Sequence, residues 1–500
     1  MENIVSLAIS LAYILLVLGL ATLVARIQGG RSEYSRKLVH ILVGNWVFIT
    51  PFFTSLWAVA LVPFTFIIVN ALSIRFHFFK AMTREHENLG TVYYAFSMFA
   101  LSSAAYLLGW KELAFIGLLT MAYGDGFASL VGGRWGKHHP FSFAREKSLE
   151  GSITVAVAAF LVTLACIALI PELHSDLKTT FYSWQYGDSV SMRIFIAESI
   201  LIALATGIFA AFVELTGKHG CDNLSVPIAT GLFASLLLRY GSIGMTLYLL
   251  VALAILIYAF RKSAITADGI VAAELTAATL YAFSSIWVAG SLLLFFVAGS
   301  MVSKISNSRK RKGESRQADT GARNWKQVLC NSLPACVALW VSHFSQNTNT
   351  AALICFSVFA AACADTFSSE IGMLSSGKVL NLINLKSVPN GTSGGVTLLG
   401  VAAGIVGSAL LAIPSAGQYG IRGFFFVLVL GFFGTLIDSA LGSTIQQRFA
   451  DSRGELMDAP AYPRQRATVG IAYASNNAVN MLTLIVICIS AYFLKGLVIP

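Results

Sequence analysis

Two aspartates occupy the same motif in the two halves of an apolar chain. Asp125 begins the sequence Asp-Gly-Phe-Ala-Ser-Leu-Val-Gly, and Asp365 begins Asp-Thr-Phe-Ser-Ser-Glu-Ile-Gly. Both sequences fit D-x-F-[AS]-S-x-[VI]-G, and the two aspartates are 240 positions apart in a chain of 500 residues. Carboxylates inside membrane proteins are costly and usually functional, so both aspartates are candidate catalytic residues. The alternative for Asp125 is a helix-capping carboxylate in a cytoplasmic vestibule.

Two further polar segments follow each aspartate in the same order. The first half continues with Lys147-Ser-Leu-Glu-Gly-Ser and then with Asp222-Asn-Leu-Ser. The second half continues with Lys386-Ser-Val-Pro-Asn-Gly and then with Asn476-Asn-Ala-Val-Asn. This repeated order predicts two related modules in parallel orientation, at residues 1–240 and 241–500.

These residue types suit the binding of phosphate and of a divalent cation. Backbone N–H groups at a glycine-rich helix start attract phosphate, and a lysine adds a positive point charge. Carboxylate and amide oxygens hold Mg²⁺, which usually bridges a protein and the phosphates of a nucleotide. The combination therefore predicts a site for phosphate and metal in each module.

The candidate residues lie beside these motifs. The predicted nucleotide- and phosphate-binding residues are Arg36, Lys37, Lys147, Gly151, Ser152, Arg323, Lys386, Asn390, Gly391, Thr392, Ser393, Gly394 and Gly395. The predicted Mg²⁺ ligands are Asp125, Asp222, Asn223, Asp365, Glu370, Asp438 and Asn477. Two other polar residues are notable, because His40 could join Arg36 and Lys37 in clamping phosphate and Glu214 stands within an apolar segment.

Several of these residues have a structural interpretation that the sequence leaves open. Asp222 and Asn223 could cap a helix, and Lys147 could serve only to set the topology. Arg36 and Lys37 could reach along the bilayer to its surface, and Asp438 and Asn477 could bond to neighbouring helices. Asp365 and Glu370 are five residues apart, about 140° around a helix, so we expect them to face different neighbours.

The composition excludes a soluble multi-domain protein. Hydrophobic residues make up 56% of the chain, charged residues 12%, and the mean hydropathy is +0.73. These values indicate an all-α polytopic membrane protein. About sixteen apolar segments are long enough to cross a bilayer. They are residues 4–25, 38–53, 55–74, 92–108, 112–132, 151–171, 194–214, 224–238, 243–260, 266–284, 286–303, 327–342, 350–372, 394–413, 421–445 and 468–493.

The basic residues indicate how these segments are oriented. Placing the segments alternately across the bilayer puts 28 of the 34 Lys and Arg residues on one side and 6 on the other. Because basic loops stay in the cytoplasm, loop 304–326 is predicted inside, and both termini and loop 172–193 outside. The net charge of +10 then requires no nucleic-acid partner. We interpret the run Arg309–Lys312 as a solvated topology anchor rather than an anion site.

The two halves resemble two families of membrane lipid kinases. The first resembles the polyprenol kinases, including phytol and dolichol kinase, of the CDP-diacylglycerol synthase superfamily. This resemblance covers residues 30–240. It rests on five motifs, which are RKLVH from Arg36, YGDGFA from Tyr123, GGRWG from Gly132, KSLEGS from Lys147 and DNLSVP from Asp222. The second resembles the family that includes phytyl-phosphate kinase. This second resemblance covers about residues 265–495. It rests on the motifs RNWKQVL from Arg323, ADTFSSE from Ala364, VPNGTSGG from Val388, DSALG from Asp438 and NNAVN from Asn476.

The resemblance implies a bifunctional kinase in a bacterial plasma membrane, with its active sites on the cytoplasmic face. The first module would transfer the γ-phosphoryl group of CTP, or of UTP or ATP, to an isoprenoid alcohol such as phytol in the presence of Mg²⁺. The second would convert the isoprenyl monophosphate to the diphosphate. The second motif departs from the first, with Thr366 where the first has Gly126 and Glu370 where the first has Leu130. The second site is therefore expected to hold its metal or acceptor phosphate differently.

Two other functions fit the same residues. A cytidylyltransferase would use CTP to attach CMP to a lipid phosphate and would release pyrophosphate. A secondary transporter with parallel repeats would also contain glycine-rich broken helices and buried carboxylates. A transporter would place its carboxylates near the bilayer midplane, whereas the sequence places Asp125 and Asp365 near the cytoplasmic ends of their segments.

Overall fold

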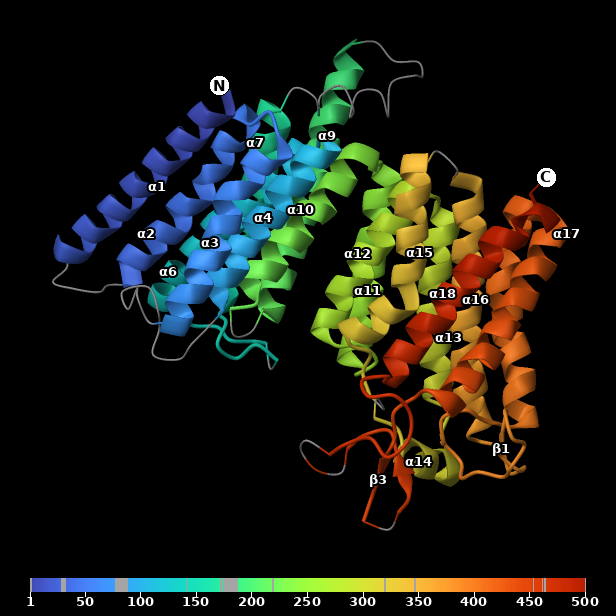
Figure 1. Ribbon diagram of the computed structural model, residues 1–500. Helices are drawn as coiled ribbons and strands as arrows, with labels where there is room; N and C mark the ends of the chain where they lie inside the picture. The colour runs from blue at the N-terminus through green and yellow to red at the C-terminus, as the bar shows by residue number, and fades with distance from the viewer. Residues whose placement is uncertain are drawn as a thin grey trace. The chain divides into compact units, whose positions relative to one another are not determined.

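The chain folds into helices grouped in two compact units. The computed structural model describes residues 2–27, 33–76, 89–141, 143–170, 173, 188–217, 220–318, 321–345, 348–452, 454–460, 462 and 465–499. Unit 1 spans residues 1–250 and unit 2 spans residues 251–500. Each unit is described by itself below (Figure 1).

Unit 1 is built from helices that surround a buried central pair. Its elements are α1 (Glu2–Ile27), α2 (Glu33–Gly44), the 3-10 helix η1 (Asn45–Phe52), α3 (Leu56–Phe76), α4 (Gly90–Leu108), α5 (Lys111–Leu119), the π-helix η2 (Thr120–Asp125), α6 (Gly126–Trp135), α7 (Leu149–Leu169), α9 (Asp188–Thr216) and α10 (Asp222–Tyr240). Helix α11 (Ile243–Arg261) crosses the boundary to unit 2. The central pair is α5 and α10, whose residues are mostly buried.

Unit 2 surrounds a single central helix. Its elements are α12 (Ala267–Phe283), α13 (Ile286–Ser303), α14 (Ser308–Glu314), α15 (Trp325–Ser345), α16 (Thr348–Gly372), β1 (Leu380–Asn381), β2 (Gly395–Val396), α17 (Leu398–Thr444), β3 (Phe449–Ala450), β4 (Leu456–Met457), α18 (Asn476–Leu494) and η3 (Lys495–Leu497). The strands form two antiparallel pairs, β1 with β2 and β3 with β4. Helix α16 contacts α13, α15, α17 and α18. In its most apolar stretch, 89% of the residues are buried.

The predicted all-α membrane architecture is confirmed, but the number of spans differs. Among the described residues, twelve helices are long and apolar enough to cross a membrane. Segment 38–53 divides into α2 and η1, α12 has only 17 residues, and the buried α10 is less apolar than the twelve. The break predicted between 413 and 421 is present, because Gly420 has a φ of 65° and kinks α17. Of the predicted loops, residues 77–87 and most of 172–193 lie outside the described residues.

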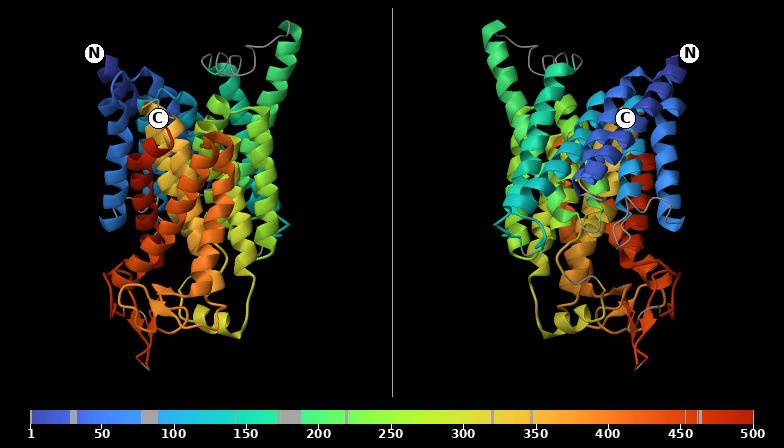
Figure 2. Two further views of the ribbon diagram at one scale, coloured as in Figure 1. Left: turned by 90° about the vertical axis from the view of Figure 1, so that its right-hand side faces the viewer. Right: turned by 90° about the vertical axis from the view of Figure 1, so that its left-hand side faces the viewer.

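One end of unit 2 carries most of its structure outside the helices. Helix α14 and the two strand pairs gather at this end (Figures 1 and 2). Helix α14, β1, β3 and β4 come from three loops predicted to be basic and cytoplasmic, at residues 304–326, 378–386 and 448–466, whereas β2 lies at the start of the predicted segment 394–413. The three loops therefore share one side of the unit, as an alternating set of spans requires.

The central pair of unit 1 depends on two glycines that allow close approach. A Cβ on Gly231 of α10 would lie 2.5 Å from the Leu113 carbonyl oxygen and 3.2 Å from Gly117 Cα. A Cβ on Gly117 would lie 2.5 Å from the Pro227 carbonyl oxygen. Small residues at helix crossings let membrane helices gain contact area that larger side chains would prevent.

We expect Gly231→Leu to lower the free energy of unfolding by about 1–3 kcal/mol, because the added side chain forces α5 and α10 apart. Thermal unfolding in detergent measures this change. Gly19→Leu is the matched control, since no atom lies within 4 Å of a Cβ on Gly19. Equal melting temperatures for the two variants would contradict the close crossing.

Candidate active sites

Asp125 ends the π-helical turn between α5 and α6 and faces α2. Its Oδ2 lies 3.1 Å from Lys37 Nζ and 3.4 Å from His40 Nε2, and its side chain is 20% exposed. The His40 ring stacks on Tyr94, with centroids 4.7 Å apart, and Tyr94 donates to the His40 carbonyl oxygen. π-Helical turns inside helices are frequent at functional sites. Lys37 contacts the predicted catalytic carboxylate, and its contact with phosphate stays a prediction.

Lys147 lies between two carboxylates from other helices. Its Nζ is 2.5 Å from Glu214 Oε1 at the end of α9 and 3.3 Å from Asp222 Oδ2 at the start of α10. Burial lowers the pKa of Lys147, but Glu214 and Asp222 outweigh that effect and raise it above the ordinary value. The ammonium therefore stays charged at neutral pH. Asp125 also interacts electrostatically with Lys147, so both groups belong to one charged cluster.

We call Lys37, His40, Asp125, Lys147, Glu214 and Asp222 the unit 1 cluster. Its oxygens suit Mg²⁺, which needs only one or two carboxylates when substrate phosphates and water complete its coordination. Glu214 Oε2 and the neighbouring Asn223 Oδ1 are buried and have no hydrogen-bond partner in the described part of the chain. No three His, Cys, Asp or Glu residues within that part lie close enough together to form a complete metal site. The predicted ligands therefore fit a cation that a substrate helps to hold.

Gly151 and Ser152 pack the first turn of α7. The Ser148 side chain caps this helix by accepting a hydrogen bond from Gly151 N at 3.2 Å, and Ser152 Oγ donates to the Ser148 carbonyl oxygen. A Cβ on Gly151 would lie 3.3 Å from the Ala128 carbonyl oxygen of α6. These contacts give Gly151 and Ser152 a packing role, and their contact with nucleotide phosphate stays a prediction.

In unit 2, α16 and α17 each contribute an aspartate to the site. Asp365 accepts a hydrogen bond from Thr435 at 3.5 Å, and Asp438 accepts one from Thr483 at 3.2 Å. The Asn480 amide, oriented as its neighbours require, donates to Asp438 Oδ2 at 3.0 Å. The two aspartates repel each other electrostatically. Two acidic groups with neutral hydrogen-bond donors form a site that favours a cation.

Asn477 is the predicted Mg²⁺ ligand of the Asn476–Asn480 motif, but the residue of this motif that contacts Asp438 is Asn480. Asn477 Oδ1 accepts a weak hydrogen bond from Cys330 Sγ of α15 at 3.5 Å, and its role as a Mg²⁺ ligand stays a prediction. The motif itself contained the signal, because Asn476 to Asn480 is one helical turn and either end can face α17. The sequence could not decide which one does.

Glu370 faces a different set of residues from Asp365. Its Oε1 accepts from Ser303 Oγ of α13 at 2.8 Å, and its Oε2 lies 2.6 Å from Lys310 Nζ of α14. The side chain of Lys310 is fully buried. The interpretation of this run as a solvated anchor is therefore wrong for Lys310. A basic run gives no sequence signal that one of its members turns inward.

The glycine-rich loop predicted to cradle phosphate forms a tight turn. Gly391 and Gly394 have φ angles of 80° and 79°, which residues with a side chain rarely adopt. Thr392 accepts a hydrogen bond from Gly395 N at 2.9 Å across this turn. Ser393 Oγ donates to both carboxylate oxygens of Asp458, at 3.1 and 3.2 Å, although the sequence did not select Asp458.

The two predicted anion contacts of unit 2 lie in different surroundings. Lys386 is exposed on the β1–β2 loop. Arg323 points inward and donates to the Phe296 carbonyl oxygen at 3.3 Å, and its guanidinium lies 5.5 Å from the Phe295 ring centre. Neither side chain contacts the glycine-rich loop through a hydrogen bond within the described residues. Their role as anion contacts stays a prediction.

We expect Lys147→Met to lower the free energy of unfolding by about 3–5 kcal/mol, because it leaves Glu214 and Asp222 without their counter-charge. Thermal unfolding in detergent measures the loss. Adding Glu214→Gln to Lys147→Met should recover part of it by removing one carboxylate charge. Lys137→Met is the control, since Lys137 is exposed. A wild-type melting temperature for Lys147→Met would contradict this account of the cluster.

The chain is similar in sequence to known membrane proteins, each of which matches part of it. The family described as "Integral membrane protein DUF92" matches residues 250–488. The chain is 31% identical over 233 residues to a phytol kinase of Synechocystis sp., which covers 46% of this chain and 90% of that protein. It is 30% identical over 221 residues to Protein PGR of Arabidopsis thaliana, which covers 39% of this chain and 76% of that protein.

A third relative is an uncharacterized membrane protein of Methanocaldococcus jannaschii. The chain is 32% identical to it over 158 residues, which cover 31% of this chain and 64% of that protein. No solved structure matches the chain. Because an alignment at 31% identity covers nine-tenths of the Synechocystis protein, the chain belongs to the membrane protein family that includes phytol kinase.

Proposed function

We propose that the protein is a bifunctional membrane kinase that phosphorylates an isoprenoid alcohol in unit 1 and the resulting monophosphate in unit 2. The observation that carries the proposal is the unit 1 cluster, in which Asp125 is held by Lys37 and His40 while Lys147 lies nearby between two carboxylates. Membership of the phytol kinase family supports the reaction class. The match of residues 250–488 to a separate membrane family supports a second, distinct site.

In unit 1, Asp125 is positioned to accept the proton of the substrate hydroxyl. Lys37 and His40 both contact Oδ2, which leaves Oδ1 to face the alcohol. The alcohol oxygen attacks the γ-phosphorus of the nucleotide, the bond from that phosphorus to the β–γ bridging oxygen breaks, and the nucleoside diphosphate leaves. Lys37 and Lys147 offset the negative charge of the phosphates, and a Mg²⁺ held by Asp222 and Asn223 would supply the remaining charge. CTP is the proposed donor, with UTP and ATP as alternatives.

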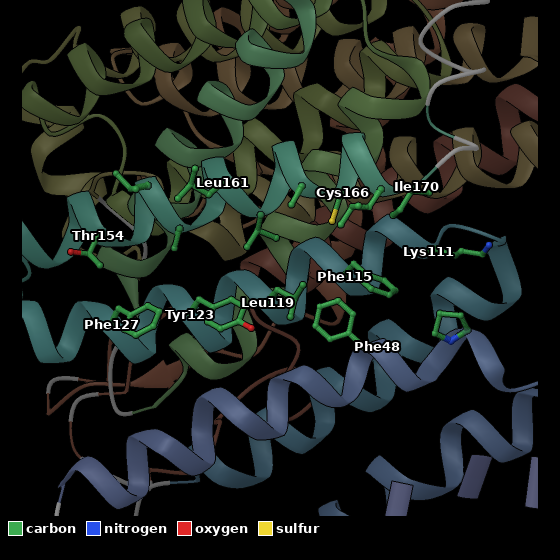
Figure 3. Close-up of a pocket in the computed structure, with 16 residues that line it drawn as sticks. Phe48, Lys111, Phe115, Leu119, Tyr123, Phe127, Thr154, Leu161, Cys166 and Ile170 are labelled. Carbon is green, nitrogen blue, oxygen red and sulfur yellow. The ribbon is translucent and has the colours of Figure 1, made fainter. Parts of the chain in front are cut away.

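An apolar cavity beside this segment suits an isoprenoid chain. It has a volume of about 790 Å³ and lies between η1, the α5–η2–α6 segment and α7 (Figure 3). Phe115, Leu119, Tyr123 and Phe127 line it at every fourth position, so they form one continuous face. Tyr123 is two residues from Asp125, and its hydroxyl donates to Asn45 Oδ1 just after the helix that carries Lys37 and His40.

The helical segment that lines the cavity is long enough to accompany a diterpenoid chain. From Lys111 to Phe127 the lining segment extends about 24 Å, at about 1.5 Å per residue. An extended carbon chain advances about 1.2 Å per bond, so a backbone of about sixteen carbons, as in phytol, takes about 18 Å. The exposed flanks at Phe127 and Leu161 let such a chain enter sideways from the bilayer.

In unit 2, the acceptor is a phosphate that is already ionised, so the second step needs no general base. We therefore assign Asp365 and Asp438 to Mg²⁺ rather than to proton transfer. A phosphate oxygen of the monophosphate attacks the γ-phosphorus of a second nucleotide and a second nucleoside diphosphate leaves. The monophosphate remains anchored in the bilayer by its chain, which supports two steps in one protein.

We expect Asp125→Asn and Asp365→Asn to separate the two steps. Asp125→Asn should lower monophosphate formation by about a hundredfold or more, because it removes the proton acceptor. Asp365→Asn should leave that step intact and let monophosphate accumulate. Thin-layer analysis of products from phytol, farnesol or geranylgeraniol with CTP and Mg²⁺ measures both effects. Supplying monophosphate to Asp125→Asn should restore diphosphate formation.

Each other outcome of this experiment assigns a different function. Loss of both steps in both variants would rule out two independent sites. Release of pyrophosphate instead of a nucleoside diphosphate would identify a cytidylyltransferase. No nucleotide consumption with any isoprenoid alcohol, together with solute accumulation in liposomes, would identify a transporter.

We expect Ala158→Phe to reduce kcat/KM for phytol by about tenfold or more, because the added ring displaces several buried methylenes from the cavity that Ala158 lines. A five-carbon isoprenol should be affected less. Ala168→Phe is the matched control, since Ala168 is exposed on the same helix and does not line the cavity. The same loss for both alcohols, or for both variants, would contradict binding of the chain in this cavity.

A further inference from the structure

Helix α14 is fixed in place by a buried lysine. The ammonium of Lys310 donates to the carbonyl oxygens of Ser303 at 2.9 Å and Ile305 at 2.7 Å, and it lies 2.6 Å from Glu370 Oε2. Burying a charge is costly unless it is paired and hydrogen-bonded, as it is here. Setting topology requires only a charge on the correct side of the bilayer. The burial of Lys310 is therefore not explained by topology. Its ion pair with Glu370 holds α14 against α16.

The same helix is joined to the glycine-rich loop. A Cβ on Gly391 would lie 2.4 Å from the Gly313 carbonyl oxygen, so the loop and α14 are in backbone contact. The Asn390 amide donates to the Arg309 carbonyl oxygen at 3.3 Å, and Arg316 donates to the Asn390 carbonyl oxygen at 3.4 Å. The basic run and the loop predicted to bind phosphate thus form one structure.

A third segment closes this structure from the other side. Arg316 forms an ion pair with Glu455 at 2.8 Å and accepts a hydrogen bond at its carbonyl oxygen from Asp458 N at 2.9 Å. The Asp458 carboxylate accepts from Ser393, which also accepts from Gln446 at 2.8 Å. We call residues 308–316, 389–395, 446–452 and 454–458 the unit 2 cap. It lies at the end of unit 2 that carries β1 and β3 (Figure 1).

The unit 2 cap keeps an excess of positive charge on its surface. Arg309, Arg311 and Lys312 are exposed. Of the nearby carboxylates, Glu455 is paired with Arg316, Glu314 lies 3.9 Å from Lys310 and Asp458 accepts from Ser393. Arginine side chains bind phosphate through paired N–H donors, and lysine adds a point charge. The exposed charges adjoin the glycine-rich loop, because Gly391 is in backbone contact with Gly313 of α14, and a cluster of basic side chains suits a polyphosphate.

We infer that the unit 2 cap binds the triphosphate of the nucleotide that unit 2 uses, with Arg311 and Lys312 as its principal contacts and Lys310 as a positioning residue. The inference rests on the proposed function, because it names the donor site of the second phosphorylation. An anionic lipid headgroup presents the same phosphate chemistry from the bilayer side. The experiment must therefore distinguish a soluble nucleotide from a lipid surface.

The test compares two double variants of the full-length protein. Arg311→Gln with Lys312→Gln removes two exposed charges of the cap, and Lys304→Gln with Lys326→Gln removes two exposed charges of the same predicted cytoplasmic loop outside it. For the cap variant, we expect KM for CTP in the second step to rise about tenfold or more, with kcat changed less. KM for CTP in the first step should stay within about twofold in both variants.

An unchanged KM in the second step for the cap variant would overturn the inference. Reduced flotation with phosphatidylglycerol vesicles and an unchanged KM would overturn it in favour of a lipid surface. If the wild-type protein makes no diphosphate, the proposed function of unit 2 fails, and equilibrium binding of CTP with Mg²⁺ decides the inference alone. Loss of one bound CTP per chain in the cap variant would uphold it, and equal binding to both double variants would overturn it.

Discussion

The need to neutralise buried carboxylates determines how both sites are built. A carboxylate taken out of water must be paired, hydrogen-bonded or protonated. Unit 1 meets this need with two lysines, because Lys37 pairs with Asp125 beside the His40 ring and Lys147 pairs with Glu214 and Asp222. Each of these pairs joins different elements. The charges therefore fix the relative positions of α2, η2, α9, α10 and the segment before α7.

Unit 2 meets the same need with fewer cations inside the helical bundle. Asp365 and Asp438 rely on the hydroxyls of Thr435 and Thr483 and on the Asn480 amide. Within the described residues no lysine or arginine forms an ion pair with either aspartate, which is why we propose a bound cation there rather than a general base. The positive charges lie instead in the unit 2 cap. This difference agrees with the two proposed steps, of which the first removes a proton from an alcohol and the second joins two phosphates.

Much of the architecture could be predicted from the sequence, because apolar length and basic asymmetry follow directly from the bilayer. The motif at Asp125 and Asp365 also identified a carboxylate in each unit that a side chain of another helix contacts. The choice of Asn477 over Asn480, the inward turn of Lys310 and the role of Asp458 depend on contacts between residues distant in sequence. The exposed position of Lys386 has the same cause, because its match to Lys147 in the motif gives no information on burial.

The most direct test of the central claim is the number of nucleotides consumed for each lipid product. Purified wild-type protein is given a limiting isoprenoid alcohol, Mg²⁺ and CTP labelled in the γ-phosphate, and both the lipid products and the released nucleotide are counted over time. The account predicts that monophosphate appears first and that each diphosphate formed carries two labelled phosphates and releases two molecules of CDP. One labelled phosphate per lipid without further reaction, or release of pyrophosphate, would contradict it.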